Sequence, residues 1–453
     1  MNDMRHAWQT FALAAATIFM VSLDATVVVA AFPALRAAFV DSNAATLSWV
    51  INGYTIVFAA LLVPFGRIVD QVGHRFCFWL STAGFTLASA VCGLASSPEW
   101  LIAARVVQAI AAAMISPASL ALILSAFPVE QRGRSAGLWS AVGALAAASG
   151  PVIGSWLIEW ISWRMIFLIN LPIGLAVLFW SHLKVIQDHP IAVKKRFDLA
   201  GTMLVIGGVG GIAGGLSQAG ESALSSIHVM LPILLGVVLM VGLLLWARQR
   251  ENSALDLRLF ADRHYRWASL AMLLLGIAFG LMFLSFYLLF TGLWHYPQSA
   301  AGLAATPGPF VATLVAAGLS HRFLKSGVHR PMMIGGLVFA ASNGWLALNL
   351  NAEPDYFAVW LPGQVLGGIA IGLMLPGIAA AAVAHLPPHL LGTGSAVSSA
   401  LRQLGSALGV ALAVALVGSE TAAINSFRAV YAGLVACGGL IAAIAWRQKW
   451  LRL

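Results

Sequence analysis

Long apolar runs follow one another along the whole chain, and this repetition constrains the fold more than any other feature of the sequence. A run of about 20 apolar residues can cross the hydrocarbon core of a bilayer as an α-helix, whose backbone hydrogen bonds are satisfied internally. The runs are residues 8–31, 47–66, 76–95, 100–123, 134–157, 163–182, 198–217, 228–247, 267–290, 300–320, 331–350, 356–378, 394–417 and 428–446. We therefore predict fourteen transmembrane helices. The seventh is the weakest, because it contains the poor helix former GGVGGIAGG.

The composition excludes an ordinary soluble protein. Hydrophobic residues make up 60% of the chain and charged residues 9%, whereas soluble domains carry about a quarter charged residues. No linker or low-complexity tract is long enough to hold a separate soluble domain. The three cysteines have no metal-ligand spacing, and the net charge of +9 does not by itself imply nucleic acid. The sequence thus predicts an all-α integral membrane protein without a metal site or a nucleic-acid partner.

The distribution of Lys and Arg predicts the orientation of the spans. If the N-terminus is cytoplasmic, the inside segments hold 20 of the 25 basic residues and the outside segments hold three. The other two, Arg105 and Arg402, lie inside spans. Because short cytoplasmic loops are enriched in basic residues, we expect both termini on the cytoplasmic side of the cytoplasmic (inner) membrane.

Two segments of the chain resemble each other. Residues 128–150 and 387–409 align at an offset of 259, with glycines matching at Gly150 and Gly409. Two related halves with a site between them are a common plan in transporters. Chance alignment of helices rich in small residues is the alternative, and the sequence leaves it open.

Asp24, within VSLDATVVVAAFPAL, is the only acid that lies clearly inside a predicted span. A charge at that depth costs a few kcal/mol or more, so it normally faces a cavity or a partner. Arg105 is a candidate partner, because both residues lie in the outer halves of their spans. A carboxyl group in a partly dry cavity can exchange protons reversibly, which makes Asp24 a candidate proton carrier. A purely structural pairing with an arginine is the alternative.

Arg402 is the second unexplained charge, in the thirteenth span. It could extend to the cytoplasmic surface, line a cavity or bind an anionic group of a substrate. Spans seven to fourteen contain no deeply placed acid, and a carrier of dications would be expected to offer two buried carboxylates. We therefore expect monocationic, zwitterionic or neutral substrates.

The segment GRIVDQVGHR, residues 66–75, connects the second and third spans. Gly66 and Gly73 permit a tight turn with close helix approach. Asp70 and Arg75 can pair with each other or with neighbouring helix ends. This pattern indicates an ordered loop that does more than set topology.

Four stretches carry a family resemblance. GRIVDQVGHR resembles the loop signature of the major facilitator superfamily, and LIAARVVQAIAAA (101–113) resembles its fourth-span signature. GALAAASGPVIGS (143–155) resembles the antiporter signature of span five. LDATVVVAAFPAL (23–35) resembles the first-span signature of the fourteen-span drug:proton antiporters. The chain is thus identified by resemblance with that family.

The resemblance implies two six-helix bundles with two extra transmembrane helices between them. The corresponding predicted boundaries are 1–190, 191–250 and 251–453. It also implies roles for particular residues. These are proton coupling (Asp24, Arg105), a cytoplasmic gate (Gly66, Arg67, Asp70, Gly73, Arg75), an antiporter motif (Gly143, Gly150, Pro151, Gly154) and cavity positions (Gln108, Arg402). Val29, Ala109, Ser155 and Leu324 depart from the family pattern, so the resemblance does not define the substrate.

The resemblance implies a function as well. We expect proton-coupled efflux of hydrophobic drugs or toxic compounds by alternating access, driven by the proton gradient without a cofactor. A transporter of a single metabolite or natural product on the same fold is the alternative. An enzyme would need a nucleophile, a metal cluster or paired acids, and the spans offer a lone Asp24. The expected partners are the substrate, protons and lipid, with a functional monomer and an accessory periplasmic protein left open.

Overall fold

The computed structural model describes residues 2–184, 198–219, 222, 225–250, 256–318, 327–386, 390–417 and 423–450. The described residues form helices and connections without strands. The α-helices are α1 (Asn2–Ala30), α2 (Phe32–Ala38), α3 (Ala44–Val72), α4 (His74–Gly93), α5 (Pro98–Ala126), α6 (Val129–Trp160), α7 (Met165–Leu168), α8 (Asn170–Lys184), α9 (Leu199–Gln218), α10 (Ile227–Arg248), α11 (Arg263–Leu288), α12 (Gln298–Ala305), α13 (Pro307–Gly318), α15 (His329–Asn349), α16 (Leu361–Val383), α17 (Leu391–Val417) and α18 (Ile424–Trp450). Three short helical turns, η1 (Leu257–Ala261), η2 (Leu289–Leu293) and η3 (Tyr356–Trp360), complete them.

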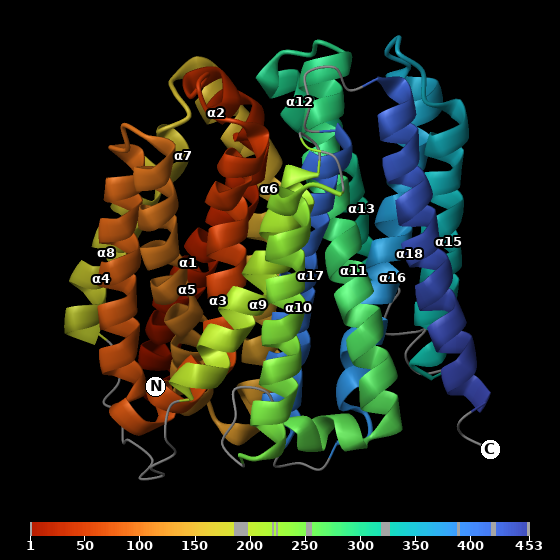
Figure 1. The fold of residues 1–453 in the computed structure, drawn as a ribbon. Helices are drawn as coiled ribbons and strands as arrows, with labels where there is room; N and C mark the ends of the chain where they lie inside the picture. Colours follow the sequence, from red (N-terminus) through yellow and green to blue (C-terminus); the bar gives the residue numbers. More distant parts are fainter. Residues whose placement is uncertain are drawn as a thin grey trace.

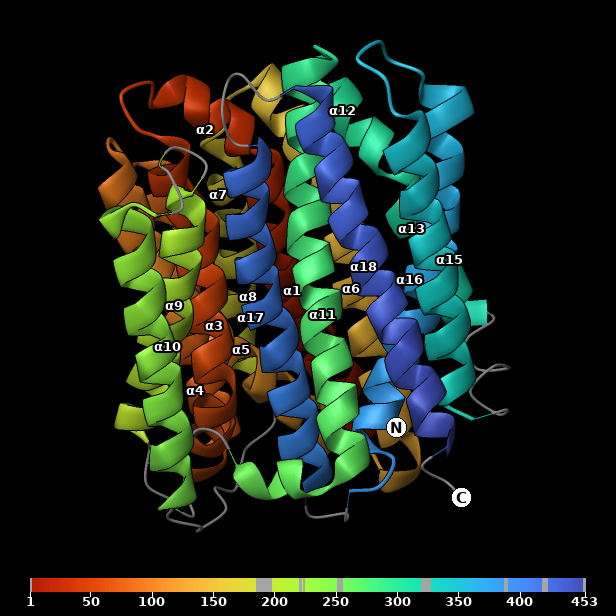
Figure 2. The same cartoon turned by 45° about the vertical axis from the view of Figure 1, so that its right-hand side comes forward.

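The long helices run up and down side by side, and both chain ends lie at the same end of the bundle (Figure 1). In the N-terminal part, α1 packs against α5, α6 and α8, while α4 packs against α5 and α8. In the C-terminal part, α11 packs against α16, α17 and α18, and α15 against α16 and α18. We call the end with the termini the basic end, because the predicted inside loops lie there, and the other end, with α2 and α12, the opposite end (Figure 2).

Thirteen of the described helices are long and apolar enough to cross a membrane, so this is a multi-pass membrane protein. They correspond to thirteen of the fourteen predicted spans. The sixth run, residues 163–182, forms the short helices α7 and α8, and its apolar helical part, Met165–Ser181, is shorter than the others. The count of fourteen therefore stays a prediction at this one position.

Helices α9 and α10 lie alongside the join between the two parts of the molecule (Figure 1). Helix α9 contacts α3 on one side and α17 on the other, and α10 packs on α9. The run GGVGGIAGG is helical despite its composition, because close packing rewards small residues there. A Cβ atom on Gly211 or Gly215 would overlap backbone atoms of α10. The predicted domain boundaries at 190/191 and 250/251 adjoin residues outside the described ranges and remain predictions.

The segment GRIVDQVGHR differs from the predicted loop. Helix α3 continues through it to Val72, and α4 begins at His74. The turn is a single residue, Gly73, with a φ of 113° that favours glycine. Gly66 therefore lies inside a helix and not in the turn. Across the turn, Asp70 pairs with His74 at 3.3 Å.

The repeated segments occupy matching positions. A Cβ atom on Gly150 would overlap Thr26, so α6 packs tightly on α1. A Cβ atom on Gly409 would overlap the backbone of Ile277, so α17 packs tightly on α11. In each part, the aligned glycine lies at a close contact between the helix that carries it and the first long helix of that part.

Candidate functional site

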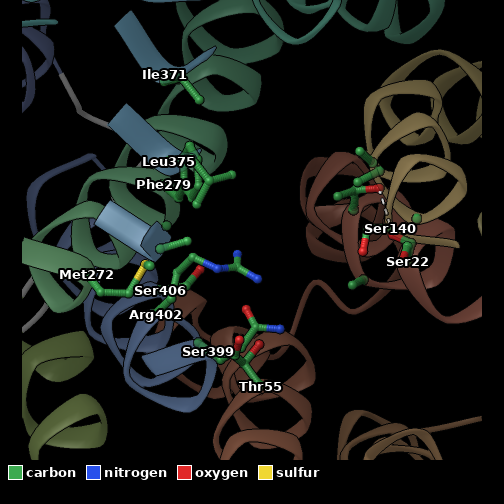
Figure 3. A pocket seen from close by; sticks show the side chains of 18 of the residues that line it. Ser22, Thr55, Ser140, Met272, Phe279, Ile371, Leu375, Ser399, Arg402 and Ser406 are labelled. Atoms are coloured by element: carbon green, nitrogen blue, oxygen red, sulfur yellow. Dashed lines mark hydrogen bonds between the residues drawn. The ribbon is translucent and has the colours of Figure 1, made fainter. Parts of the chain in front are cut away.

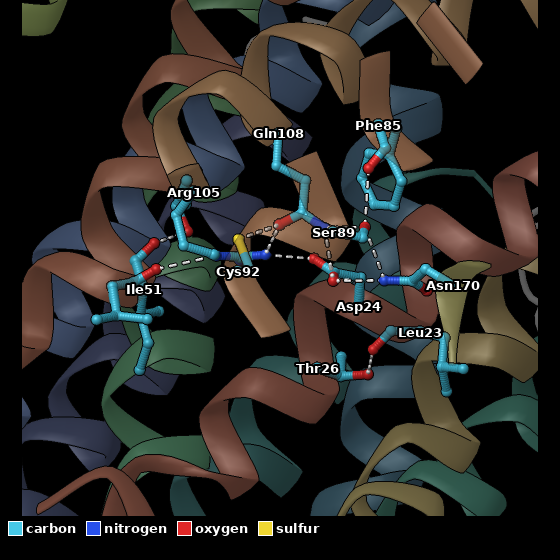
Figure 4. A network of polar contacts seen from close by, with 12 residues as sticks. Leu23, Asp24, Thr26, Ile51, Phe85, Ser89, Cys92, Arg105, Gln108 and Asn170 are labelled. Carbon is cyan, nitrogen blue, oxygen red and sulfur yellow. Dashed lines mark hydrogen bonds and ion pairs between the residues drawn. The ribbon is translucent and has the colours of Figure 1, made fainter. Parts of the chain in front are cut away.

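A buried polar cluster lies inside the N-terminal part, where α1, α4, α5 and α8 meet (Figure 4). Arg105 Nη1 of α5 donates to Asp24 Oδ2 of α1 at 2.5 Å, and each residue is only 1% exposed. The predicted pairing of these two charges is therefore present. The helices are direct neighbours, which the sequence could not establish.

Amide side chains complete the shell around the carboxylate. Gln108 Nε2 and Asn170 Nδ2 each donate to Asp24 Oδ1 at 3.0 Å. The same two groups donate to Ser89 Oγ, at 2.7 and 3.3 Å. A buried charge is tolerated when it is both paired and hydrogen-bonded, and Asp24 meets both conditions.

The guanidinium of Arg105 is also fully enclosed. Its Nε donates to the carbonyl of Val50 at 3.2 Å, and Nη1 donates to Gln108 Oε1 at 2.5 Å. The ring of Tyr54 lies 4.0 Å from the guanidinium carbon, as in a cation–π contact. The cluster thus holds one positive and one negative charge in a closed shell of neutral donors, acceptors and an aromatic face.

Sequence reasoning missed four members of this cluster: Asn170, Ser89, Cys92 and Tyr54. Asn170 follows an apolar stretch and precedes Leu-Pro within a predicted span, and a buried amide in a span requires a partner. That signal could have been used. Ser89 gives no such signal, because serines are common in the predicted spans.

A second feature is a cavity of about 1070 Å³ between the two parts of the molecule. Residues of α1, α3, α5 and α6 line it on one side and residues of α11, α13, α15, α16 and α17 on the other. The wall reaches Asp70 and Thr393 at the basic end. Figure 3 shows hydroxyl and apolar side chains of the wall facing each other across the open space of the cavity.

The positions expected for Asp24 and Gln108, both facing the cavity, were wrong. Asp24 and Gln108 are absent from its described wall, whereas Ser22, Ala25 and Thr26 of the same helix α1 line it. The reason is helix geometry: Asp24 projects toward α5 and α8, while its neighbours on α1 face the cavity. Gln108 follows Arg105 by one helical turn and shares its buried face, so it belongs to the cluster and not to the cavity.

Arg402 lines the cavity, which is one of the three positions that the sequence left open for it. Its side chain extends from α17 into the open space (Figure 3). Among the described lining residues, the other charged side chains are Arg67 and Asp70, both near the basic end of α3. Gly66 lines the same mouth, whereas Gly73 forms the turn and Arg75 lies in the first turn of α4.

The two parts touch at the opposite end. Gln298 Nε2 of α12 donates to the carbonyl of Ala30 at 2.5 Å. The backbone N–H of Ser299 donates to Glu159 of α6 at 2.6 Å. These contacts join the N-terminal and C-terminal parts at the opposite end of the bundle. The wall of the cavity, in contrast, extends to the basic end.

The antiporter-motif residues lie along α6. Gly150 and Gly154 face Thr26 and Val27 of α1, and Pro151 lies within the continuous helix. Gly143 lines the cavity. Ser155, which replaces the usual last glycine, lies against Gly302 of α12, where a Cβ on Gly302 would overlap it. The motif thus lets α6 pack closely on both parts.

Sequence similarity places the chain among known proteins. The family model of the Major Facilitator Superfamily matches residues 14–197. A puromycin resistance protein from Streptomyces alboniger is 34% identical, over 90% of this chain and 81% of that protein. This chain belongs to the major facilitator superfamily. A cephamycin export protein from Amycolatopsis lactamdurans is 31% identical, over 90% of this chain and 85% of that protein.

Solved structures agree with the fold. A D-xylose-proton symporter matches with a TM-score of 0.70 over 97% of each chain, at 13% identity. The nucleoside transporter NupG matches with a TM-score of 0.66, over 98% of this chain and 99% of that one, at 11% identity. These likenesses establish the arrangement of helices. Together with the family, they make this protein a membrane transporter, with drug and antibiotic export proteins among its relatives.

Proposed function

We propose that this protein exports hydrophobic compounds in exchange for protons, by exposing its cavity alternately to the two faces of the membrane. The observation that carries the proposal is the buried Asp24–Arg105 ion pair, on the reverse side of a cavity-lining helix. In this proposal the proton gradient supplies the energy and no bound cofactor takes part. The monomer is the functional unit, because one chain encloses the cavity.

Proton binding to Asp24 would remove the charge that compensates Arg105. A buried guanidinium without a counter-charge costs several kcal/mol, so the protonated state favours a rearrangement of α1 against α5. Ser22, Ala25 and Thr26 lie on α1 and line the cavity, so the rearrangement alters its wall. Protonation and substrate affinity are thereby linked without any contact between the proton and the substrate.

The cavity wall supports a hydrophobic substrate. Most of its side chains are apolar, and uncharged hydroxyl and amide groups make up most of the rest, which suits drug-sized compounds. The sequence predicted monocationic, zwitterionic or neutral compounds. Because Asp70 at the mouth is the one acid in the described wall, neutral compounds fit the cavity better than cations. The names of the resistance and export relatives support the outward direction.

Proton release from inside-out vesicles tests the proposal. Vesicles with an acidified lumen and a fluorescent pH probe receive a panel of neutral, cationic and acidic lipophilic compounds. The wild type should leak protons on compound addition, and Asp24→Asn should not. Asp41→Asn, an exposed acid after α2, is the matched control and should behave as the wild type. Size-exclusion profiles establish that each variant is folded.

The outcomes separate the parts of the proposal. Leakage from Asp24→Asn equal to that of the wild type would remove Asp24 from the coupling but keep the exchange. No leakage from the wild type with any compound would contradict drug–proton exchange and favour a transporter of a single metabolite.

A further inference from the structure

Arg402 is a cation without a counter-charge in the part of the chain that the structure describes. No described carboxylate forms an ion pair with it, and its side chain has no hydrogen-bond partner there. Asp24, the acid buried in the neighbouring cluster, is already neutralised by Arg105. A charged guanidinium in a low-dielectric region is stable only with water or an anion beside it.

Packing fixes the position of this arginine. Arg402 lies about three turns into α17, roughly 16 Å along the axis from its start at Leu391. A Cβ atom on Gly276 of α11 would overlap the carbonyl oxygen of Arg402, so the two backbones are in contact. Helix α17 therefore cannot turn its Arg402 face away from the cavity without breaking this contact. The depth and the packing both disfavour an extension of the side chain to the basic end.

The surroundings of Arg402 suit an oxyanion. Ser399 and Ser406 provide hydroxyl groups on the nearby wall, and Met272 and Phe279 provide apolar surface (Figure 3). Hydroxyl groups can donate to an oxyanion alongside the fork of guanidinium N–H groups. The remaining charged groups of the described wall, Arg67 and Asp70, lie at the mouth of the cavity. The deep part of the cavity therefore has a positive potential that attracts anions and repels lipophilic cations.

We propose that Arg402 binds an oxyanion group, such as a carboxylate or a sulfonate, on the exported compound. The favoured substrates are then hydrophobic molecules with one acidic group, whose apolar body lies against the cavity wall. This inference rests on the proposed function, because it takes the cavity to be the substrate site.

A pair of fluorescent probes with one aromatic skeleton tests the assignment. 1-Anilinonaphthalene-8-sulfonate carries a sulfonate, whereas N-phenyl-1-naphthylamine lacks it. Binding of each is measured to the full-length protein in zwitterionic phosphatidylcholine nanodiscs, with empty nanodiscs subtracted. Arg402→Gln should weaken sulfonate binding by about tenfold to a hundredfold, the range for a lost charge-assisted hydrogen bond. The neutral probe should bind both proteins equally.

Two further variants make the test specific. Arg402→Lys keeps the charge and should retain most of the preference for the sulfonate, although it loses the bidentate fork. Arg258→Gln removes the same charge from the exposed turn η1, outside the cavity wall. It should change the affinity for neither the sulfonate nor the neutral probe. Equal sulfonate binding by wild type and Arg402→Gln would overturn the proposal, as would a wild type that prefers the neutral probe.

This binding test is independent of the proton-release test. If Arg402→Gln binds both probes as the wild type does while vesicles still exchange protons for compounds, the anion site fails and the exporter stands. If the wild type shows no exchange yet binds the sulfonate through Arg402, the exporter fails and the anion site stands.

Discussion

Asp24 receives hydrogen bonds from Arg105, Gln108 and Asn170, which come from two other helices. This coordination explains why a carboxylate persists inside an apolar helix: its charge is paired, and both of its oxygens are bonded. The same coordination makes the cluster sensitive to the loss of any one charge. Removing one partner of a buried ion pair is more harmful than removing both.

We expect Arg105→Gln to be strongly destabilising, because it leaves the Asp24 carboxylate buried without a cation. The loss should be about 3–5 kcal/mol in free energy of unfolding. The double variant Asp24→Asn with Arg105→Gln should be less destabilised than Arg105→Gln alone. Thermal unfolding of the purified proteins in detergent measures both. A double variant that unfolds at a lower temperature than Arg105→Gln would show that the pair is not the source of the effect.

Glycines set the closest helix contacts at the level of whole elements. Gly405 and Gly409 of α17 and Gly276 and Gly280 of α11 let the two backbones touch over several turns. Without a hydrophobic driving force between helices in lipid, such close packing supplies much of the association energy. The contact also determines which face of α17 looks into the cavity, so it positions Arg402.

Gly409→Ala should therefore disturb α17 against α11, because the added methyl group meets backbone atoms that cannot move aside. Overpacking of this kind typically costs about 1–3 kcal/mol. Gly439→Ala, on α18, is the matched control, since a Cβ atom there would have no neighbouring atom within 4 Å. Thermal unfolding should show a lower midpoint for Gly409→Ala only. Equal midpoints for the two variants would contradict the close contact.

The whole molecule is asymmetric from end to end. The two parts are joined at the opposite end by Gln298 and Ser299 of α12, while the cavity wall reaches the basic end. A transporter that works by alternating access must open one end and close the other. In the proposed transport cycle, the structure corresponds to the state whose cavity is directed toward the predicted cytoplasmic side.

Thiol labelling tests this direction. Ser140→Cys places a reactive group on the exposed cavity wall of α6, and the three native cysteines are buried and should react slowly. A membrane-impermeant maleimide should label the variant in inside-out vesicles and much less in intact cells. Faster labelling from the outside would mean that the resting protein is open at the other end.

The sequence by itself determined the membrane class and the order of the spans. Runs of apolar residues are a one-dimensional property, since each span must match the bilayer alone, and so thirteen predicted spans appear as long helices. The pairing of Asp24 with Arg105 was also predictable, because an intramembrane charge requires a partner and few were available. The turn at Gly73 was anticipated, although α3 extends up to it and no loop intervenes.

Only the tertiary structure decided which way each side chain faces. Asp24 and Gln108 lie in a closed cluster and Arg402 lies in the cavity, although all three are polar groups inside predicted spans. Asn170 reaches Asp24 across 146 positions of sequence, a contact that no local pattern encodes. The physical reason is that hydropathy places a helix in the membrane, whereas its rotation about its own axis depends on the shapes of its neighbours.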